Sequence, residues 1–246
     1  MATLTGKSAI VTGASRGIGA AIAKRLAKEG AEVAITYSSS PERAQQIVDE
    51  IVADGGKAIA IKADAADQAA IRAGVQQAAQ QFGKIDILVN NAGILALGPI
   101  ADFSPDSFDK AIAVNVTSVF TAIQESLRHM PDGGRIITIG SVNSERMPFV
   151  GGSVYALTKG AVASFTKGLA RDLGERRITV NNIQPGPVDT EANPASGPFA
   201  DTMLGLMALK RYAHADEIAG MTAYLAGPEA GYVTGASLLI DGGFAA

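Results

Sequence analysis

The residues with the clearest chemical meaning are a tyrosine and a lysine four positions apart, Tyr155 and Lys159. On a helix, side chains at this spacing lie on one face and reach a common ligand. A free tyrosine has a pKa of about 10, too high for acid–base work at neutral pH, but a neighbouring ammonium lowers that pKa. The pair therefore predicts proton transfer at a substrate oxygen. The alternative is a packed tyrosine beside a solvated lysine.

A glycine-rich segment near the chain start predicts a second kind of chemistry. Thr12 to Gly19 reads TGASRGIG and lies between an apolar run and an alanine-rich helical pattern. Glycines in this position let the backbone approach a pyrophosphate, whose charge meets the free N–H groups at the helix start. That context favours a dinucleotide site over a turn that serves only packing. The residues expected to contact the dinucleotide are Gly13, Ser15, Arg16, Gly17, Ile18 and Gly19.

The end of the second predicted strand indicates which dinucleotide binds. An NAD site needs an acidic residue about twenty residues beyond the glycines, to accept hydrogen bonds from the ribose 2′-hydroxyl. Thr36 to Ser40 reads TYSSS and has no carboxylate. Serine hydroxyls donate to a 2′-phosphate, and Arg16 and Arg43 can neutralise its charge. We therefore expect NADP(H), although the serines can also cap the next helix. The residues expected around the phosphate are Tyr37, Ser38 and Ser39.

A single carboxylate follows the third predicted strand, and its role has two alternatives. Asp64 can accept a hydrogen bond from the adenine amine, with the backbone of Ala65 beside it. It can equally cap the helix that follows. The sequence does not decide between the two roles.

Short β-branched runs alternate with longer helical patterns along almost the whole chain. Several runs are continuously apolar, which is typical of parallel strands covered on both faces. The pattern predicts one α/β domain over 1–246, a doubly wound Rossmann fold with a seven-stranded, mostly parallel sheet. The predicted strands are Ala9–Val11, Glu32–Thr36, Ala58–Lys62, Ile85–Asn90, Arg135–Ile139, Thr179–Ile183 and Ser237–Ile240. The predicted helices are Ile18–Glu29, Pro41–Asp54, Gln68–Phe82, Pro105–Leu127, Tyr155–Leu173 and Ala215–Leu225.

Local signals mark some helix ends and one long loop. Ser104 followed by Pro105 predicts a helix start, and Gly30 and Gly55 lie where helices should stop. The segment 185–213, rich in Pro, Gly, Ala and Met, has no regular pattern. A loop this long in a compact domain is usually functional, so we expect it to cover the substrate.

Composition excludes several functional classes. The chain has 246 residues, 47% of them hydrophobic, and no cysteine, which excludes disulfides, thiolate metal sites and a cysteine nucleophile. His129 and His214 are isolated, so no metal site is expected. A net charge of −3 without basic runs argues against nucleic-acid polymers and anionic membranes. The longest uncharged apolar stretch, Ile87–Ala101, is too short to span a bilayer, and we expect a cytoplasmic protein.

Two further motifs complete a set that resembles the short-chain dehydrogenase/reductase family. The run Asn90-Asn91-Ala92-Gly93 ends the fourth predicted strand, and a P-G-x-x-x-T turn begins at Pro185. The glycine spacing G-x-x-x-G-x-G is also that of the family, and the resemblance covers the whole chain. It implies further cofactor contacts at Asn91, Ala92, Gly93, Tyr155, Lys159, Pro185, Gly186, Val188 and Thr190.

The same resemblance implies a catalytic set of Asn115, Ser141, Tyr155 and Lys159. In the family, the tyrosine exchanges a proton with the substrate oxygen and the serine polarises that oxygen. The lysine binds the nicotinamide ribose and tunes the tyrosine, and the asparagine holds a water that links the lysine to solvent. Taken alone, Asn115 has a plain alternative as a satisfied helix residue, and Ser141 as a turn residue.

The resemblance implies NADPH-dependent reduction of a carbonyl, or the reverse oxidation of an alcohol, by a homotetramer. Within the family the chain is similar to 3-oxoacyl-carrier-protein reductases. Those enzymes usually carry basic residues before the fifth strand, where this chain has Met130–Gly134, so we expect a free small ketone or aldehyde. The expected pocket walls are Leu95, Val142, Asn143, Met147, Phe149, Met203 and Met207.

A second resemblance implies a different function. The segments 140–143, 146–148, 191–198 and 240–244 are similar to those of a biofilm-dispersal subgroup, which implies binding of cyclic di-GMP. The alternative function is therefore sequestration of this nucleotide on a reductase fold. All four residues of the catalytic set are present, which favours the enzyme.

Overall fold

The seven apolar runs form one sheet in the computed structural model, which describes residues 3–246. The strand order is β3-β2-β1-β4-β5-β6-β7, and each neighbouring pair is parallel. The predicted seven-stranded Rossmann sheet is confirmed, and it is parallel throughout. The strands are β1 (Ser8–Val11), β2 (Glu32–Tyr37), β3 (Lys57–Lys62), β4 (Ile87–Asn90), β5 (Arg135–Ile139), β6 (Thr179–Pro185) and β7 (Ser237–Ile240).

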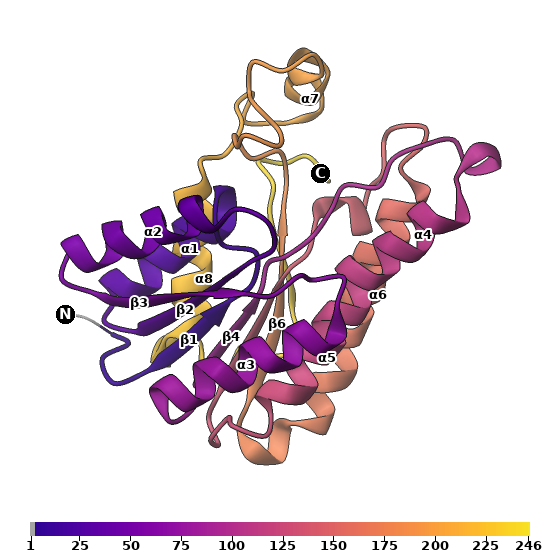
Figure 1. Ribbon diagram of the computed structural model, residues 1–246. Coiled ribbons are helices and arrows are strands. Elements are labelled where there is room, and N and C mark those ends of the chain that lie inside the picture. Colours follow the sequence, from indigo (N-terminus) through magenta and orange to yellow (C-terminus); the bar gives the residue numbers. More distant parts are fainter. Residues whose placement is uncertain (1–2) are drawn as a thin grey trace.

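Helices cover both faces of the sheet (Figure 1). They are α1 (Gly17–Lys28), α2 (Pro41–Ala53), α3 (Gln68–Phe82), α4 (Pro105–Ile112), α5 (Ser118–Ser126), α6 (Ser153–Asp172), α7 (Ala200–Leu206) and α8 (Ala215–Ala226). In β1, Ala9 and Val11 join the core beneath α1, α2 and α8, whereas Ile10 joins the core beneath α3, α5 and α6. Because both faces are buried, the strand is apolar without alternation.

The predicted helix ends are confirmed. The Ser104 hydroxyl accepts a hydrogen bond from the backbone N–H of Ser107 at 3.2 Å, and Pro105 occupies the first turn of α4. Gly30 and Gly55, just beyond α1 and α2, have φ angles of 98° and 83°. These left-handed conformations end the helices at little cost only with glycine.

The helix predicted over Pro105–Leu127 forms, but with one irregularity. A π-helical turn, Ala113–Thr117, separates α4 from α5. Such a turn inserts extra backbone into a helix and is frequent at functional sites. Here it contains Asn115, whose side chain bonds the backbone of the segment that follows β4.

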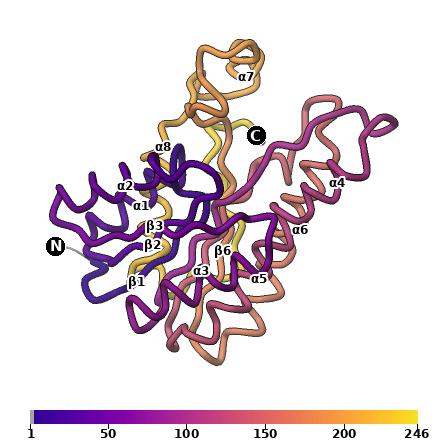
Figure 2. The backbone as a smooth tube through the Cα atoms, in the orientation of Figure 1, coloured from indigo at the N-terminus to yellow at the C-terminus, as the bar shows by residue number. Residues whose placement is uncertain are grey.

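The long loop also differs from its prediction. Pro185 belongs to β6, and α7 forms within the stretch expected to be irregular. The loop rises beyond the carboxyl ends of the strands and lies near the C-terminus of the chain (Figure 2). The contact is apolar, because Met207 and Tyr212 of the loop pack in one buried cluster with Phe244 and Val142.

The order of the strands places the site. The chain passes from β1 outward to β2 and β3 on one side, then returns to β4 on the other side of β1. Ligands of doubly wound sheets bind in the crevice outside the carboxyl ends at such a switch point. The glycine loop after β1 and the Asn90-Asn91-Ala92-Gly93 run after β4 both lie there.

Candidate functional site

The glycine loop turns sharply between β1 and α1. Gly13 and Gly17 have φ angles of 63° and 57°, a conformation that other residues rarely adopt. A Cβ on Gly13 would lie 2.9 Å from the Cα of Ala92, and one on Gly19 would lie 2.8 Å from the Cα of Ala14. The glycines therefore let the loop pack closely against its own backbone and against the segment after β4.

Two threonines at the ends of neighbouring strands hold this loop in place. The Thr12 hydroxyl accepts hydrogen bonds from the backbone N–H groups of Asn91, at 3.0 Å, and Ala92, at 3.1 Å. The Thr36 hydroxyl accepts from the N–H of Gly13 at 3.1 Å. The Asn91 amide returns bonds to the carbonyls of Thr12 and Gly13 at 2.9 and 3.0 Å. The threonines were not predicted, although each ends an apolar strand with a hydroxyl.

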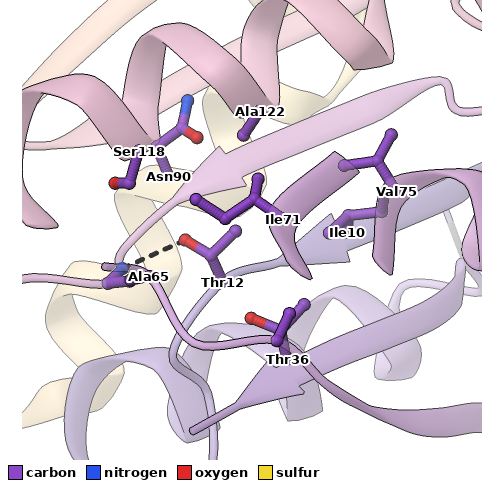
Figure 3. Close-up of a pocket in the computed structure, with 11 residues that line it drawn as sticks. Ile10, Thr12, Thr36, Ala65, Ile71, Val75, Asn90, Ser118 and Ala122 are labelled. Carbon is purple, nitrogen blue, oxygen red and sulfur yellow. Dashed lines mark hydrogen bonds between the residues drawn. The ribbon is translucent and has the colours of Figure 1, made fainter. Parts of the chain in front are cut away.

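Figure 3 shows a small hollow behind this loop, where Thr12, Thr36, Asn90 and Ser118 surround a mainly apolar space. Ile71 of α3 is among the apolar residues that line it. The hollow is small and lies between the sheet on one side and helices α3 and α5 on the other. The residues around it support the glycine loop, and the space does not admit a large ligand.

A long groove runs across the carboxyl ends of the strands and gathers the predicted dinucleotide contacts. Its walls come from the glycine loop, the end of β2, the end of β3 and the segment after β4. The predicted residues that line it are Gly13, Ser15, Arg16, Gly17, Ile18, Gly19, Tyr37, Ser38, Ser39, Asp64, Ala65, Asn91, Ala92, Gly93 and Thr190.

Asp64 lines the groove and does not cap α3. Its carboxylate accepts a hydrogen bond from the backbone N–H of Ala66 at 3.0 Å, within its own turn. Asp67 caps the helix instead, because its side chain accepts from N–H groups of the first turn. The helix-cap alternative for Asp64 is therefore wrong.

The end of the groove beside β2 is built for an anion. Arg16 and Arg43 line it together with Ser38 and Ser39. Ser40 is the N-cap of α2, but its side chain makes no capping hydrogen bond. Two guanidinium groups and free hydroxyls are the donor set that a ribose 2′-phosphate requires. With the bare glycine backbone nearby, these residues fit a phosphorylated dinucleotide.

A second hollow continues from this groove. Asn91, Gly93 and Thr190 line both spaces, so the two are contiguous. The predicted residues that line the second hollow are Ile18, Asn91, Gly93, Ser141, Tyr155, Lys159, Pro185, Gly186, Val188 and Thr190.

Lys159 is buried in α6 and held by one backbone contact. Its Nζ donates a hydrogen bond to the carbonyl of Ile139, the last residue of β5, at 3.0 Å. It also lies 5.8 Å from the centre of the Tyr155 ring. Burial lowers the pKa of Lys159 from its ordinary value to about 8. The side chain therefore carries its proton at neutral pH.

Tyr155 lies beside Ser141 at the wall of the second hollow. Burial raises the pKa of Tyr155, and a hydrogen bond with Ser141 partly opposes that effect, so the lowered pKa expected from the neighbouring Lys159 is not found. The phenol is consequently protonated at neutral pH and can donate. Ser141 is itself held by Asn143, whose backbone N–H donates to the serine hydroxyl at 3.1 Å.

Asn115 lies behind the hollow and lines neither space. Its amide accepts from the N–H of Ile94 at 2.8 Å and donates to the Ile94 carbonyl at 2.9 Å. It also donates to the Thr158 hydroxyl at 3.1 Å. Asn115 and Lys159 lie on the same side of Gly93, because a Cβ there would lie 3.4 Å from Asn115 Oδ1 and 3.5 Å from Lys159 Nζ. Thr158 was not predicted.

The turn after β6 closes the hollow from the far side. Gly186 packs tightly against the residue that follows β7, because a Cβ on Gly186 would lie 2.7 Å from the Cα of Asp241. Val188 pairs with Ala213, which joins the two ends of the long loop. Thr190 is thereby placed between the groove and the second hollow.

Five of the seven expected pocket walls divide into two groups, and the other two, Asn143 and Met147, do not line the second hollow. Leu95 lines the second hollow and is exposed. Val142 and Met207 are instead buried in the cluster around Phe244, and Phe149 and Met203 pack against that cluster. Those four residues support the long loop and do not line the hollow.

Within 3–246, no group of three or more His, Asp or Glu side chains is placed to hold a metal ion. His129 lies 3.7 Å from the buried carboxylate of Glu125, and His214 begins α8. Across the same residues, no helix combines the length and apolarity needed to cross a bilayer.

Comparison with known proteins decides the family. The family described as enoyl-(acyl carrier protein) reductase matches residues 13–245. A short-chain dehydrogenase/reductase from Serratia marcescens is 60% identical, with a TM-score of 0.98 over 99% of this chain and 100% of that chain. The chain belongs to the short-chain dehydrogenase/reductase family. It is therefore a member of an oxidoreductase family, as the motifs predicted.

Two other members of the short-chain dehydrogenase/reductase family bear on the ligand. A short-chain dehydrogenase from Burkholderia cenocepacia, solved in complex with NADP, is 51% identical with a TM-score of 0.98, over 99% of this chain and 100% of that chain. The cyclic-di-GMP-binding biofilm dispersal mediator protein of Escherichia coli is 46% identical over the full length of both chains. The two relatives correspond to the two ligands expected from the sequence.

Proposed function

We propose that this protein is an NADPH-dependent carbonyl reductase that transfers hydride to a small ketone or aldehyde, with Tyr155 as the proton donor. The observation that carries the proposal is the meeting of Ser141, Tyr155 and Lys159 in one hollow that continues the dinucleotide groove. A hydroxyl donor and a protonated phenol side by side suit an oxygen that gains negative charge.

The cofactor is NADP(H). Support comes from Arg16, Arg43 and the serine hydroxyls at the phosphate end of the groove, and from the relative that was solved with NADP. No carboxylate follows the glycines at the position that an NAD site requires. When bound, NADPH would supply the hydride. Side chains of this protein carry out the other steps.

The proposed roles rest on the family resemblance and on the residues that line the second hollow. Ser141 donates a hydrogen bond to the substrate oxygen, and Tyr155 transfers its proton to the same oxygen. Lys159, a cation at neutral pH, stabilises the phenolate that remains and binds the nicotinamide ribose. Asn115 fixes the Ile94 backbone beside the lysine and belongs to the route by which the proton is replaced.

The long loop over 185–213 is the cover of the substrate. It begins at the wall of the second hollow, and its helix α7 stands clear of the sheet (Figure 1). It contacts the body through the apolar cluster around Phe244 and through ion pairs of Glu191 and Arg211. Closure would exclude water from the reacting atoms.

We also propose that the enzyme is a homotetramer assembled through α4, α5, α6 and β7. Apolar side chains stand exposed on these elements: Phe108, Phe120 and Leu157 on the helices, and Leu239 on β7. Burial of such a surface against a second copy is favourable. Light scattering of the purified protein should therefore give about four times the 25.1 kDa chain mass.

Binding of cyclic di-GMP is the second candidate function. It is favoured by one observation, the full-length match to the Escherichia coli mediator protein. The groove that takes a dinucleotide also offers two arginines to a cyclic dinucleotide. On this alternative the groove sequesters the nucleotide and the catalytic residues are unused.

One experiment separates the candidates. NADPH oxidation is followed with a panel of small ketones, aldehydes and enoyl compounds, and the products are identified. We expect alcohols from the carbonyl compounds. Reduction of enoyl carbon–carbon bonds alone would contradict the proposed substrate class. Tight binding of cyclic di-GMP without turnover of any compound would contradict the enzyme proposal and favour the nucleotide-binding function.

A further inference from the structure

A glutamate of the long loop contacts the two arginines of the phosphate end. Glu191 follows Thr190, and its carboxylate lies 2.5 Å from Arg43 Nη1 and 3.7 Å from Arg16 Nη1. Glu191 lines the same groove as both arginines. The three residues come from α2, the glycine loop and the loop after β6, so the fold rather than the local sequence joins them.

A tight turn of the loop fixes where Glu191 stands. Thr190 and Asn193 pair across it, with the Asn193 N–H donating to the Thr190 carbonyl at 3.0 Å. The Asp189 carboxylate accepts from the N–H of Ala195 at 2.9 Å and braces the same turn. The glutamate is therefore held toward the arginines by a hydrogen-bonded turn.

Glu191 and a ribose 2′-phosphate require the same partners. The hydrogen bond from Arg43 lowers the pKa of Glu191, so its carboxylate is ionised at neutral pH. A phosphate monoester carries between one and two negative charges at that pH, and carboxylate and phosphate use the same guanidinium donors. Two anions at one pair of cations repel each other. They compete for Arg16 and Arg43.

We propose that Glu191 is a further determinant of cofactor selectivity, because it competes with the 2′-phosphate for Arg16 and Arg43 and so moderates the preference for the phosphorylated dinucleotide. The inference rests on the proposed NADP(H) site. The competition affects only the 2′-phosphate, because an adenosine that lacks this phosphate does not bind the two arginines. Removing the charge of Glu191 should therefore change binding of one ligand class and leave the other unchanged.

The test measures binding without the reaction. Isothermal titration calorimetry is run with adenosine 2′,5′-bisphosphate and with adenosine 5′-monophosphate, on the full chain and on Glu191→Gln. The matched control is Glu42→Gln, which removes the same charge from an exposed residue next to Arg43 that makes no ion pair among the described residues. Circular dichroism verifies that each variant is folded.

We expect Glu191→Gln to bind the 2′,5′-bisphosphate about threefold more tightly, a factor suited to exposed ion pairs, and to bind the monophosphate as the full chain does. The gain should shrink in high salt. Glu42→Gln should show a smaller gain. The proposal is overturned if Glu191→Gln weakens bisphosphate binding, if it changes both ligands equally, or if Glu42→Gln matches it.

The failure of this inference and of the proposed function are distinguishable. If Arg16→Ala and Arg43→Ala both bind the bisphosphate as the full chain does, the proposed phosphate site itself is wrong. If Arg43→Ala weakens bisphosphate binding while Glu191→Gln has no effect, only the role of Glu191 is wrong.

Discussion

The two ends of the ligand crevice are built by different means. At the adenosine end, hydroxyl and amide side chains tie adjacent loops together through backbone hydrogen bonds, as Thr12, Thr36 and Asn91 do. At the substrate end, the part of the long loop around α7 packs against an apolar cluster around Phe244, with a backbone hydrogen bond from Leu209 to Gly242 beside it. One end is fixed by directional bonds and the other by contacts that tolerate repacking.

This difference matches what each end must recognise. A dinucleotide has an invariant phosphate backbone, and a fixed set of N–H groups and cations suits it. A cover that opens and closes needs contacts that can be exchanged without leaving polar groups unpaired. Between the two ends lie Ser141, Tyr155 and Lys159, which line the second hollow.

The largest effect should follow from removing the phenol oxygen between the two ends. Tyr155→Phe should lower kcat by a factor of about 10² or more, because general acid catalysis is lost. Calorimetric binding of NADPH should change little, since the ring remains. Tyr224→Phe, on the exposed face of α8, is the control and should turn over normally. Wild-type turnover by Tyr155→Phe would remove this residue from the mechanism.

The adenosine end of the crevice is tested by the preference for NADPH over NADH. NADPH should give a higher kcat/KM than NADH. Arg16→Ala should lower kcat/KM for NADPH by about tenfold and leave that for NADH unchanged, because one charge-assisted contact with the phosphate is lost. Arg171→Ala, an exposed arginine at the end of α6, is the control. Equal efficiency with both cofactors in the unaltered enzyme would contradict the phosphate site.

The rate of reduction should depend on pH through Lys159. Burial disfavours its charged form and lowers its pKa to about 8, so the ammonium is present below that pH and is lost above it. The reduction rate should be flat near pH 7 and fall to about half near pH 8. Circular dichroism over the same range shows whether the protein stays folded. A rate that climbs from pH 7 to pH 9 would contradict the role of the lysine.

Changes at the long loop, residues 185–213, should give the smallest effect. Phe199 is exposed at the start of α7 and offers a site for chymotrypsin. NADPH with a ketone should slow cleavage there by about threefold, because closure orders the loop. Phe244→Ala should speed cleavage without ligands by releasing the apolar cluster. Protection by cyclic di-GMP alone would favour the alternative function.

The same contrast explains how much the sequence predicts. The glycine loop, the strands and the Tyr155–Lys159 pair follow from local patterns, since turn conformation, burial and helical spacing are local properties. The π-helical turn at Asn115 and the helix α7 do not, because each depends on contacts with distant segments. Glu191 is the clearest case: its partner Arg43 lies 148 positions away.

The central claim is tested most directly by following the hydride. NADPH carrying deuterium at nicotinamide C4, supplied as each of the two stereoisomers in parallel, is incubated with the protein and a ketone that it turns over. We expect deuterium at the carbinol carbon of the alcohol from one stereoisomer, and its formation should be slowed by about 10² in Tyr155→Phe. No deuterated alcohol from either stereoisomer with any carbonyl compound, while cyclic di-GMP binds the protein, would contradict the account.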